Sequence, residues 1–173
     1  DFHYQVITNN SQKGKKTAIK IAITAAKYNL IAQTDADCIV PPFWLNIFND
    51  FYNRHSYKMI VAPIVFYKPK TILEQLQQIE LGSLMISTGG AINIGKPIMC
   101  NAANLFYEKQ VFIDLQKEME PFMQYPSGDD VFLLHSCKKK YGNLSIGFIK
   151  SLQICVQTFT APTLQAFLHQ RAR

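Results

Sequence analysis

The spacing of apolar residues predicts alternating helices and strands in the first half of the chain. Ile19, Ile23 and Ala26 recur at helical intervals within residues 17–29, and the short apolar run 30–32 predicts a strand after them. Residues 43–52 carry aromatic and aliphatic groups at every fourth position, which predicts a helix with a buried face. Residues 59–67 then predict a strand interrupted only by Pro63, and residues 71–81 predict an amphipathic helix.

The rest of the pattern is less regular. Residues 4–8 predict a short strand. Residues 82–97 predict a loose connection, because glycines and a proline interrupt any helical or strand spacing of apolar residues. A loop running into a strand is expected over 98–107, a helix from about residue 131, extended runs over 143–149 and 152–158, and a final helix from Pro162. This alternation predicts an α/β fold with a mostly parallel sheet flanked by helices.

Composition narrows the class of protein. The chain has 173 residues, of which 48% are hydrophobic and 17% charged, as expected for one globular domain with a sizeable core. Its net charge of +6 suits an anionic partner such as a phosphate-bearing ligand, but its lysines form no basic stripe, so nucleic acid is not an expected partner. Four cysteines without metal-ligand spacing favour a reducing compartment. Without a signal peptide or a long apolar run, the chain is expected to be soluble.

The first candidate site is the pair Asp35 and Asp37, at the end of the strand predicted over 30–34. If the strand continued through them, their side chains would share one face about 7 Å apart. Two hard oxygen ligands suit Mg²⁺ or Mn²⁺ bound together with substrate phosphates. The other interpretation is that both aspartates belong to an ordinary turn. In parallel sheets ligands bind beyond the carboxyl ends of the strands, where this pair would lie.

Further candidates lie elsewhere in the chain. Lys15 sits near a predicted helix N-terminus, where backbone N–H groups favour anions. Asn101 and Asn104, among small residues, could line a hydroxyl-rich ligand or serve as turn residues. Asp129 and Asp130 precede a helix and could stabilise its dipole, or one of them could act as a general base. The pattern alone leaves both pairs of alternatives open.

The last candidates are Gln170 and Arg173, which fall three residues apart and share one face of the final helix.

Several short sequence motifs, which include most of these candidate residues, occur in a characteristic order along the chain. They are Gly14-Lys15, Thr34-Asp35-Ala36-Asp37-Cys38 with Pro41 and Trp44-Leu45, Cys100-Asn101-Ala102-Ala103-Asn104-Leu105, Ser127-Gly128-Asp129-Asp130, and Gln170-Arg171-Ala172-Arg173. Each motif is weak by itself, but together they run through nearly the whole chain. The set resembles the family 2 glycosyltransferases of the membrane-associated, cellulose-synthase-like branch.

This resemblance implies a GT-A-like fold and a hexosyltransferase. Such an enzyme moves a sugar from a nucleotide diphosphate, here expected to be UDP, to a hydroxyl of a glycan or lipid-linked acceptor, with inversion, in polysaccharide or glycolipid synthesis. By the resemblance, Asp35 lies near the nucleotide and Asp37 coordinates Mg²⁺ or Mn²⁺ on the diphosphate. Asp130 is the expected base, with Asp129 as the alternative, while Gln170 and Arg173 match a motif that meets the diphosphate.

The chain departs from this family at both ends. The tryptophan that closes the last motif would be residue 174, and the family's first strand–helix–strand unit would precede Asp1. Residues 1–173 are therefore expected to form a partial catalytic domain that lacks part of the nucleotide pocket and could be inactive alone. The parent protein is expected at the cytoplasmic face of the cell membrane, held there by parts outside this chain.

Two other interpretations fit part of the same pattern. Phosphatases of the haloacid dehalogenase type also place an Asp-x-Asp pair at a strand end, with the first aspartate as covalent nucleophile. Against them, Ile39 stands where that pattern wants Thr or Val. A non-catalytic module that binds nucleotide-sugars is the third interpretation, since a fold by itself implies no activity.

Overall fold

The structure is a computed structural model that describes residues 4–8, 15–119 and 128–171, with backbone only at residues 15, 16 and 116–119. Its elements are α1 (Lys15–Ala25), β1 (Leu30–Gln33), α2 (Trp44–Arg54), β2 (Met59–Val61), β3 (Ile64–Phe66), α3 (Ile72–Asn93), η1 (Ala102–Asn104), β4 (Leu105–Glu108), α4 (Lys109–Met119), α5 (Asp129–Tyr141), η3 (Asn143–Ser145), β5 (Ile146–Phe148), η4 (Leu152–Ile154), β6 (Val156–Thr158) and α6 (Leu164–Arg171).

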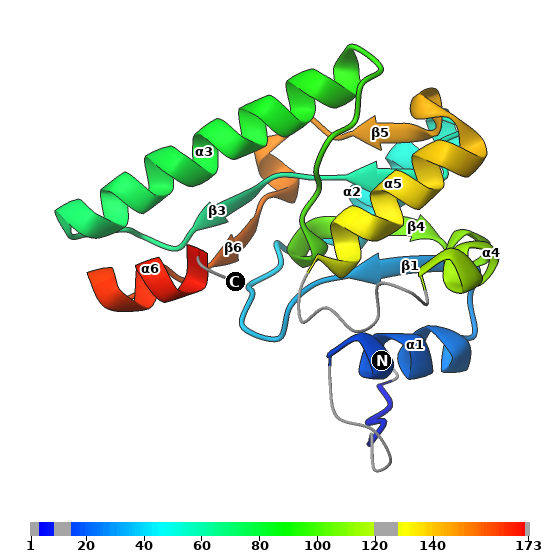
Figure 1. Ribbon diagram of the computed structural model, residues 1–173, viewed down its shortest axis with the longest axis horizontal. Helices are drawn as coiled ribbons and strands as arrows, with labels where there is room; N and C mark the ends of the chain where they lie inside the picture. Colours follow the sequence, from blue (N-terminus) through cyan, green and yellow to red (C-terminus); the bar gives the residue numbers. More distant parts are fainter. Residues whose placement is uncertain (1–3, 9–14, 120–127, 172–173) are drawn as a thin grey trace.

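The sheet is mixed. Four strands pair in the order β1-β4-β2-β5, and β3 and β6 form a separate parallel pair. Strand β4 is antiparallel to both β1 and β2, whereas β2 and β5 are parallel, so three of the four strands share one direction. Helices lie on both sides of this sheet (Figure 1), which confirms the predicted α/β class.

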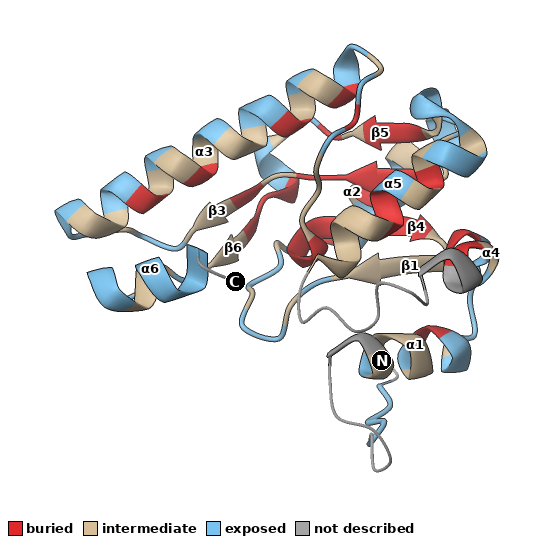
Figure 2. Ribbon diagram, viewed as in Figure 1, coloured by how far each residue is buried: buried red, intermediate tan, exposed pale blue. Residues whose placement is uncertain are grey.

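The two faces of the sheet carry separate hydrophobic clusters, because side chains alternate along each strand. Met59 and Tyr107 point to the face covered by α1, α4 and α5. Ile60 and Phe106 point to the face where α2 and Leu81 of α3 pack. Figure 2 shows the buried residues concentrated on β2, β4 and β5 between these helices.

The apolar run 59–67 forms two strands in two sheets, where one strand was predicted. Pro63 lies at the break and has no N–H to donate to a ladder. Its carbonyl accepts from Asn104 Nδ2 at 2.7 Å and from the Val156 amide at 3.3 Å. The chain thereby passes from the main sheet to the β3–β6 pair.

Helix α3 overturns the predicted loose connection over 82–97, because it continues to Asn93. A capping box at Thr71 and Glu74 starts it. Gly82 and Gly90 lie in its interior with open space around them, whereas Gly89 packs against the Phe148 ring. Glycine weakens a helix by only about 1 kcal/mol, which tertiary packing can offset.

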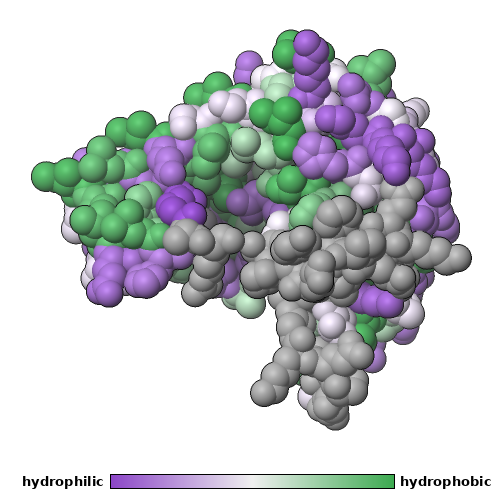
Figure 3. Space-filling model, in the orientation of Figure 1, coloured by the Kyte–Doolittle hydropathy of each residue, from purple (hydrophilic) through white to green (hydrophobic). Residues whose placement is uncertain are grey.

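The apolar face of α3, which carries Ile72, Leu76 and Ile79, is exposed to solvent. Ile72 and Ile79 are 78% and 68% exposed, and Leu76 and Ile86 are exposed as well. Figure 3 shows hydrophobic residues gathered over α3 and α6 at one end of the molecule. The buried side of the helix carries Gln77 and Thr88 as well as Leu81 and Ile92.

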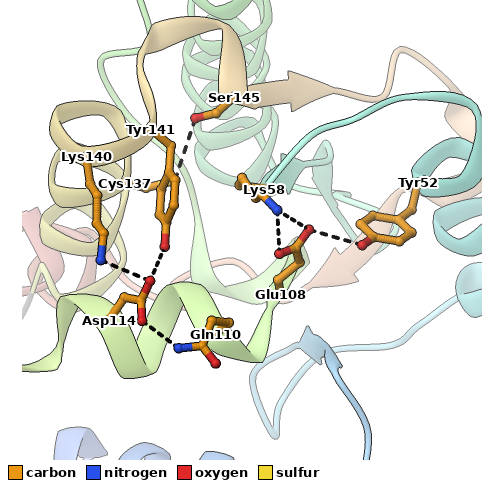
Figure 4. A network of polar contacts seen from close by, with 9 residues as sticks. All are labelled: Tyr52, Lys58, Glu108, Gln110, Asp114, Cys137, Lys140, Tyr141 and Ser145. Atoms are coloured by element: carbon orange, nitrogen blue, oxygen red, sulfur yellow. Dashed lines mark hydrogen bonds and ion pairs between the residues drawn. The ribbon is translucent and has the colours of Figure 1, made fainter.

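Two polar clusters connect the elements around β4 and α4 (Figure 4). Glu108 accepts from Lys58 at 2.8 Å and from the Tyr52 hydroxyl at 3.1 Å, which joins the end of β4 to α2 and to the segment before β2. Asp114 accepts from the Tyr141 hydroxyl at 2.5 Å and from Lys140 at 2.9 Å. This second cluster holds α4 against α5.

Residues 4–8 do not form the predicted strand; they are exposed and irregular. Among the residues that the structure describes, no helix is both long and apolar enough to cross a membrane.

Candidate functional site

The acidic pair lies in a turn just after β1. The strand ends at Gln33, so Asp35 and Asp37 do not alternate along a strand as predicted. The Cys38 amide donates to the Asp35 carbonyl at 3.1 Å and closes the turn. Asp35 is half-buried, whereas Asp37 is exposed, so at least one carboxylate reaches solvent.

The segment after this turn is paired with β6. The Ile39 amide donates to the Gln157 carbonyl at 2.8 Å, and the Gln157 amide donates back to Ile39 at 2.9 Å. Beside this bridge, burial raises the pKa of the Cys38 thiol, which a hydrogen bond with Thr158 partly offsets. Cys38 therefore stays protonated next to the acidic pair. The contact between Ile39 and Gln157 could not be predicted from the sequence, because it is made through backbone groups of residues far apart in the chain.

The second acidic pair occupies the first turn of α5. Gly128 precedes it with φ +82°, a left-handed conformation that glycine adopts without strain. Asp130 Oδ2 accepts from the Ala102 amide at 2.9 Å, and its Oδ1 accepts from the Val131 amide at 2.8 Å. The carboxylate is thereby fixed between α5 and η1.

The environment of Asp130 makes it a stronger base than an ordinary aspartate. Burial raises the pKa of its carboxyl group, and the charge of Asp129 raises it further, while the two amide donors lower it. Burial also holds the pKa of Cys100 well above its usual value, so that this thiol remains protonated where it donates to the Asp130 carbonyl at 3.2 Å. Asp130 thus combines a fixed position with raised basicity, as a general base requires.

The two asparagines have different surroundings. Asn101 is half-buried, and its side-chain oxygen caps η1 by accepting from the Ala103 amide at 2.8 Å. Asn104 is fully buried and contacts only protein. It accepts from Trp44 Nε1 at 2.8 Å and donates to the carbonyls of Pro63 and Ile154. Asn104 therefore offers no surface to an acceptor, and we assign it a structural role.

The candidates at the two ends are described only in part. Lys15 is the first residue of α1, but its side chain lies outside the described residues. Gln170 is exposed near the end of α6, and Arg173 falls outside the described residues. Gly14 and Ser127 lie outside them as well.

Within the part of the chain that the structure describes, no three His, Cys, Asp or Glu side chains form a complete metal site. The hard carboxylate oxygens of Asp35 and Asp37 nevertheless fit Mg²⁺ or Mn²⁺, since these ions bind through one or two carboxylates and take their other ligands from water and phosphate. The donor set therefore suits a metal that arrives with a phosphorylated substrate.

The structure is thus an α/β domain with one acidic pair in the turn after β1 and a second in the first turn of α5. The sequence model of Glycosyl transferase family 2 matches residues 1–115. The chain belongs to this family and has a GT-A-like fold. The match includes Asp35, Asp37, Asn101 and Asn104 and ends before Asp129. It confirms the family predicted from the motifs and decides against the phosphatase interpretation.

Several solved structures are similar to the chain, and one of them is similar over most of its length. It is the crystal structure of glucosyl-3-phosphoglycerate synthase from Mycobacterium tuberculosis in complex with phosphoglyceric acid. The TM-score is 0.54 at 12% identity, over 92% of this chain and 51% of that one. The chain thus spans about half of that enzyme and shares its fold. No curated protein matches the chain.

Proposed function

We propose that this domain belongs to an inverting glycosyltransferase that moves a hexose from a UDP-sugar to a hydroxyl acceptor. The observation that carries the proposal is Asp130, a carboxylate fixed by the Ala102 and Val131 amides with a pKa raised by burial. A hydroxyl nucleophile must lose its proton as it attacks, and a positioned base of raised pKa can accept that proton. Asp129, its neighbour in the first turn of α5, is the alternative base.

The donor side of the site is assigned to the turn after β1. Asp37 would hold Mg²⁺ or Mn²⁺ on the diphosphate and Asp35 would lie near the nucleotide, while Lys15, Gln170 and Arg173 would supply further diphosphate contacts. The ion, when bound, neutralises charge on the leaving group. The pairing of Ile39 with Gln157 supports this assignment, because it ties the acidic turn to the strand that leads into α6.

The acceptor side is assigned to η1 and the first turn of α5. Asn101 is half-buried next to Ala102, whose amide binds the carboxylate of Asp130. A hydroxyl that reached Asp130 would pass close to this segment. We therefore propose Asn101, and not Asn104, as the asparagine that contacts the glycan or lipid-linked acceptor.

We also propose that the parent works at the cytoplasmic face of a membrane, in polysaccharide or glycolipid synthesis. The exposed apolar face of α3 supports this location, because such a helix face can lie in the headgroup region of a bilayer. Lys68 and Lys70 precede α3 and would favour anionic lipid. Co-sedimentation with anionic vesicles tests it: Ile79→Glu should reduce binding, and equal binding by both proteins would contradict it.

Two variants of the parent protein test the assigned roles. Asp37→Asn should weaken UDP binding in calorimetry only when Mn²⁺ is present. Asp130→Asn should leave UDP binding intact and reduce transfer by about 10²-fold or more, as expected for loss of a general base. Asp50→Asn, which removes an exposed carboxylate on α2, is the matched control. Full transfer by Asp130→Asn would show that the base is another residue.

A further inference from the structure

The segment just before helix α6 is joined to α3 by a buried amide. The side chain of Gln77 is 1% exposed and makes two hydrogen bonds with one residue, Ala161. Its Nε2 donates to the Ala161 carbonyl at 3.1 Å, and its Oε1 accepts from the Ala161 amide at 2.9 Å. A buried amide is costly unless it is paired, so this reciprocal contact fixes where the backbone of Ala161 lies relative to α3.

A second contact holds the other end of α6. Glu80 lies one helical turn after Gln77, and its carboxylate pairs with Arg171 at 2.5 Å. The guanidinium of Arg171 also lies over the Phe167 ring, 5.1 Å from its centroid. Figure 1 shows α6 beside the first half of α3, as these contacts require. Thus α3 holds Ala161, three residues before α6 begins, through Gln77, and the last described residue of α6 through Glu80.

The stretch of chain from β6 to α6 therefore has two attachments. Gln157 of β6 pairs with Ile39, just after the acidic turn. Four residues later, Ala161 is held by Gln77 of α3. Residues 157–161 therefore contact both the segment after the acidic turn, through Gln157, and helix α3, through Ala161. The same short stretch leads into the helix that carries Gln170.

We propose that Gln77 and Glu80 are positioning residues that orient α6 so that Gln170 meets the diphosphate of the donor. This inference rests on the proposed function. Neither residue touches the donor; both act through the placement of α6. Small misplacements of binding groups cost activity steeply, so a shift of α6 should weaken donor binding and leave the acceptor side unchanged.

The test exchanges the charges of the ion pair in the parent protein. Glu80→Arg and Arg171→Glu should each raise the donor KM and the Kd for UDP in Mn²⁺ by about 10-fold, because a repelled α6 no longer holds its place. The double variant Glu80→Arg/Arg171→Glu should recover most of that loss. Both side chains are more than a third exposed, at 38% and 39%, so the variants are expected to fold.

Gln77→Met gives an independent measurement, since it keeps the volume of the side chain and removes both bonds to Ala161. Gln75→Met, an exposed glutamine two residues earlier on α3, is its control. We expect a raised donor KM, an unchanged acceptor KM and an unchanged pH profile for Gln77→Met, and wild-type values for the control. If Gln77 had only a structural role, Gln77→Met would lower the melting temperature but would not change the donor KM more than the acceptor KM.

The outcomes separate the inference from the proposed function. The inference alone would be overturned if the wild-type parent binds UDP but the donor KM and the Kd for UDP change less than twofold in Glu80→Arg and Gln77→Met. Failure of the double variant to recover donor affinity would also overturn the role of the ion pair. Absence of UDP binding by the wild-type parent would overturn both the inference and the assignment of UDP as donor.

Discussion

The indole of Trp44 donates a hydrogen bond to Asn104 Oδ1 at 2.8 Å, and both side chains are buried. Trp44 begins α2, a few residues after the acidic turn that contains Asp37. Asn104 ends η1, whose first residue, Ala102, binds Asp130. This single bond therefore connects the segment that follows one acidic pair with the segment that anchors the other.

Removal of the Asn104 side chain should destabilise the fold. Asn104→Ala would remove the acceptor of the Trp44 N–H and a donor to each of the carbonyls of Pro63 and Ile154, of which Pro63 would keep its bond from the Val156 amide. We expect a loss of about 2–4 kcal/mol in the free energy of unfolding, measured by urea titration. Asn46→Ala, at an exposed position of α2, should cost far less. Equal losses would show that the buried contacts of Asn104 contribute nothing specific.

Adjacent glycines in α3 should respond in opposite ways to alanine. A Cβ at Gly89 would lie 2.8 Å from Cε1 of Phe148, whereas one at Gly90 would meet nothing within 4 Å. Gly89→Ala should therefore destabilise the protein by about 1–3 kcal/mol through overpacking. Gly90→Ala should stabilise it by about 0.5–1 kcal/mol because alanine is the better helix former. Thermal unfolding of both variants checks the sign, and a stabilising Gly89→Ala would contradict this packing.

The Asp114 cluster should make stability depend on pH. Hydrogen bonds from Tyr141, Lys140 and Gln110 lower the pKa of Asp114 to about 2. Because the folded-state pKa lies below the usual value, the stabilisation is complete above the usual aspartate pKa and is lost as pH falls toward 2.

Urea titration of the wild type and Asp114→Asn between about pH 6 and pH 3 measures this effect. The variant should be the less stable at pH 6, and the difference should shrink on acidification. Asp50→Asn controls for the loss of one exposed negative charge. A difference that grew on acidification would contradict the lowered pKa.

The pH dependence of transfer should report the environment of Asp130. Its pKa is raised, and the base must be ionised, so the rate should rise through a pKa above that of an ordinary aspartate. Asp129→Asn removes a charge that raises this pKa and should shift the acidic limb of kcat/KM to lower pH. A limb that moved to higher pH would contradict the coupling, and loss of all activity in Asp129→Asn would make Asp129 the base.

Sequence periodicity predicted those elements whose pattern is local. Helix α2 and strand β1 appear where the spacing of apolar residues placed them, and Trp44 and Phe48 are buried as expected for the aromatic face. The first half of α3 was predicted over 71–81, but its second half escaped prediction because its glycines resemble breaks. Two of its four buried residues, Gln77 and Thr88, are polar, whereas the apolar side chains of Ile72, Leu76 and Ile79 are exposed. No local pattern could show which face the rest of the fold would cover.

The sequence by itself determined the family and the acidic residues, because order and spacing of short motifs are properties of the chain. Only the tertiary structure decided how these residues are held. Backbone groups of Ala102 and Gln157 secure the segments around Asp130 and Asp37, and buried amides of Asn104 and Gln77 connect the elements behind them. Backbone hydrogen bonds carry no side-chain signature, and a buried amide is recognised by its partners, which lie far away in the sequence.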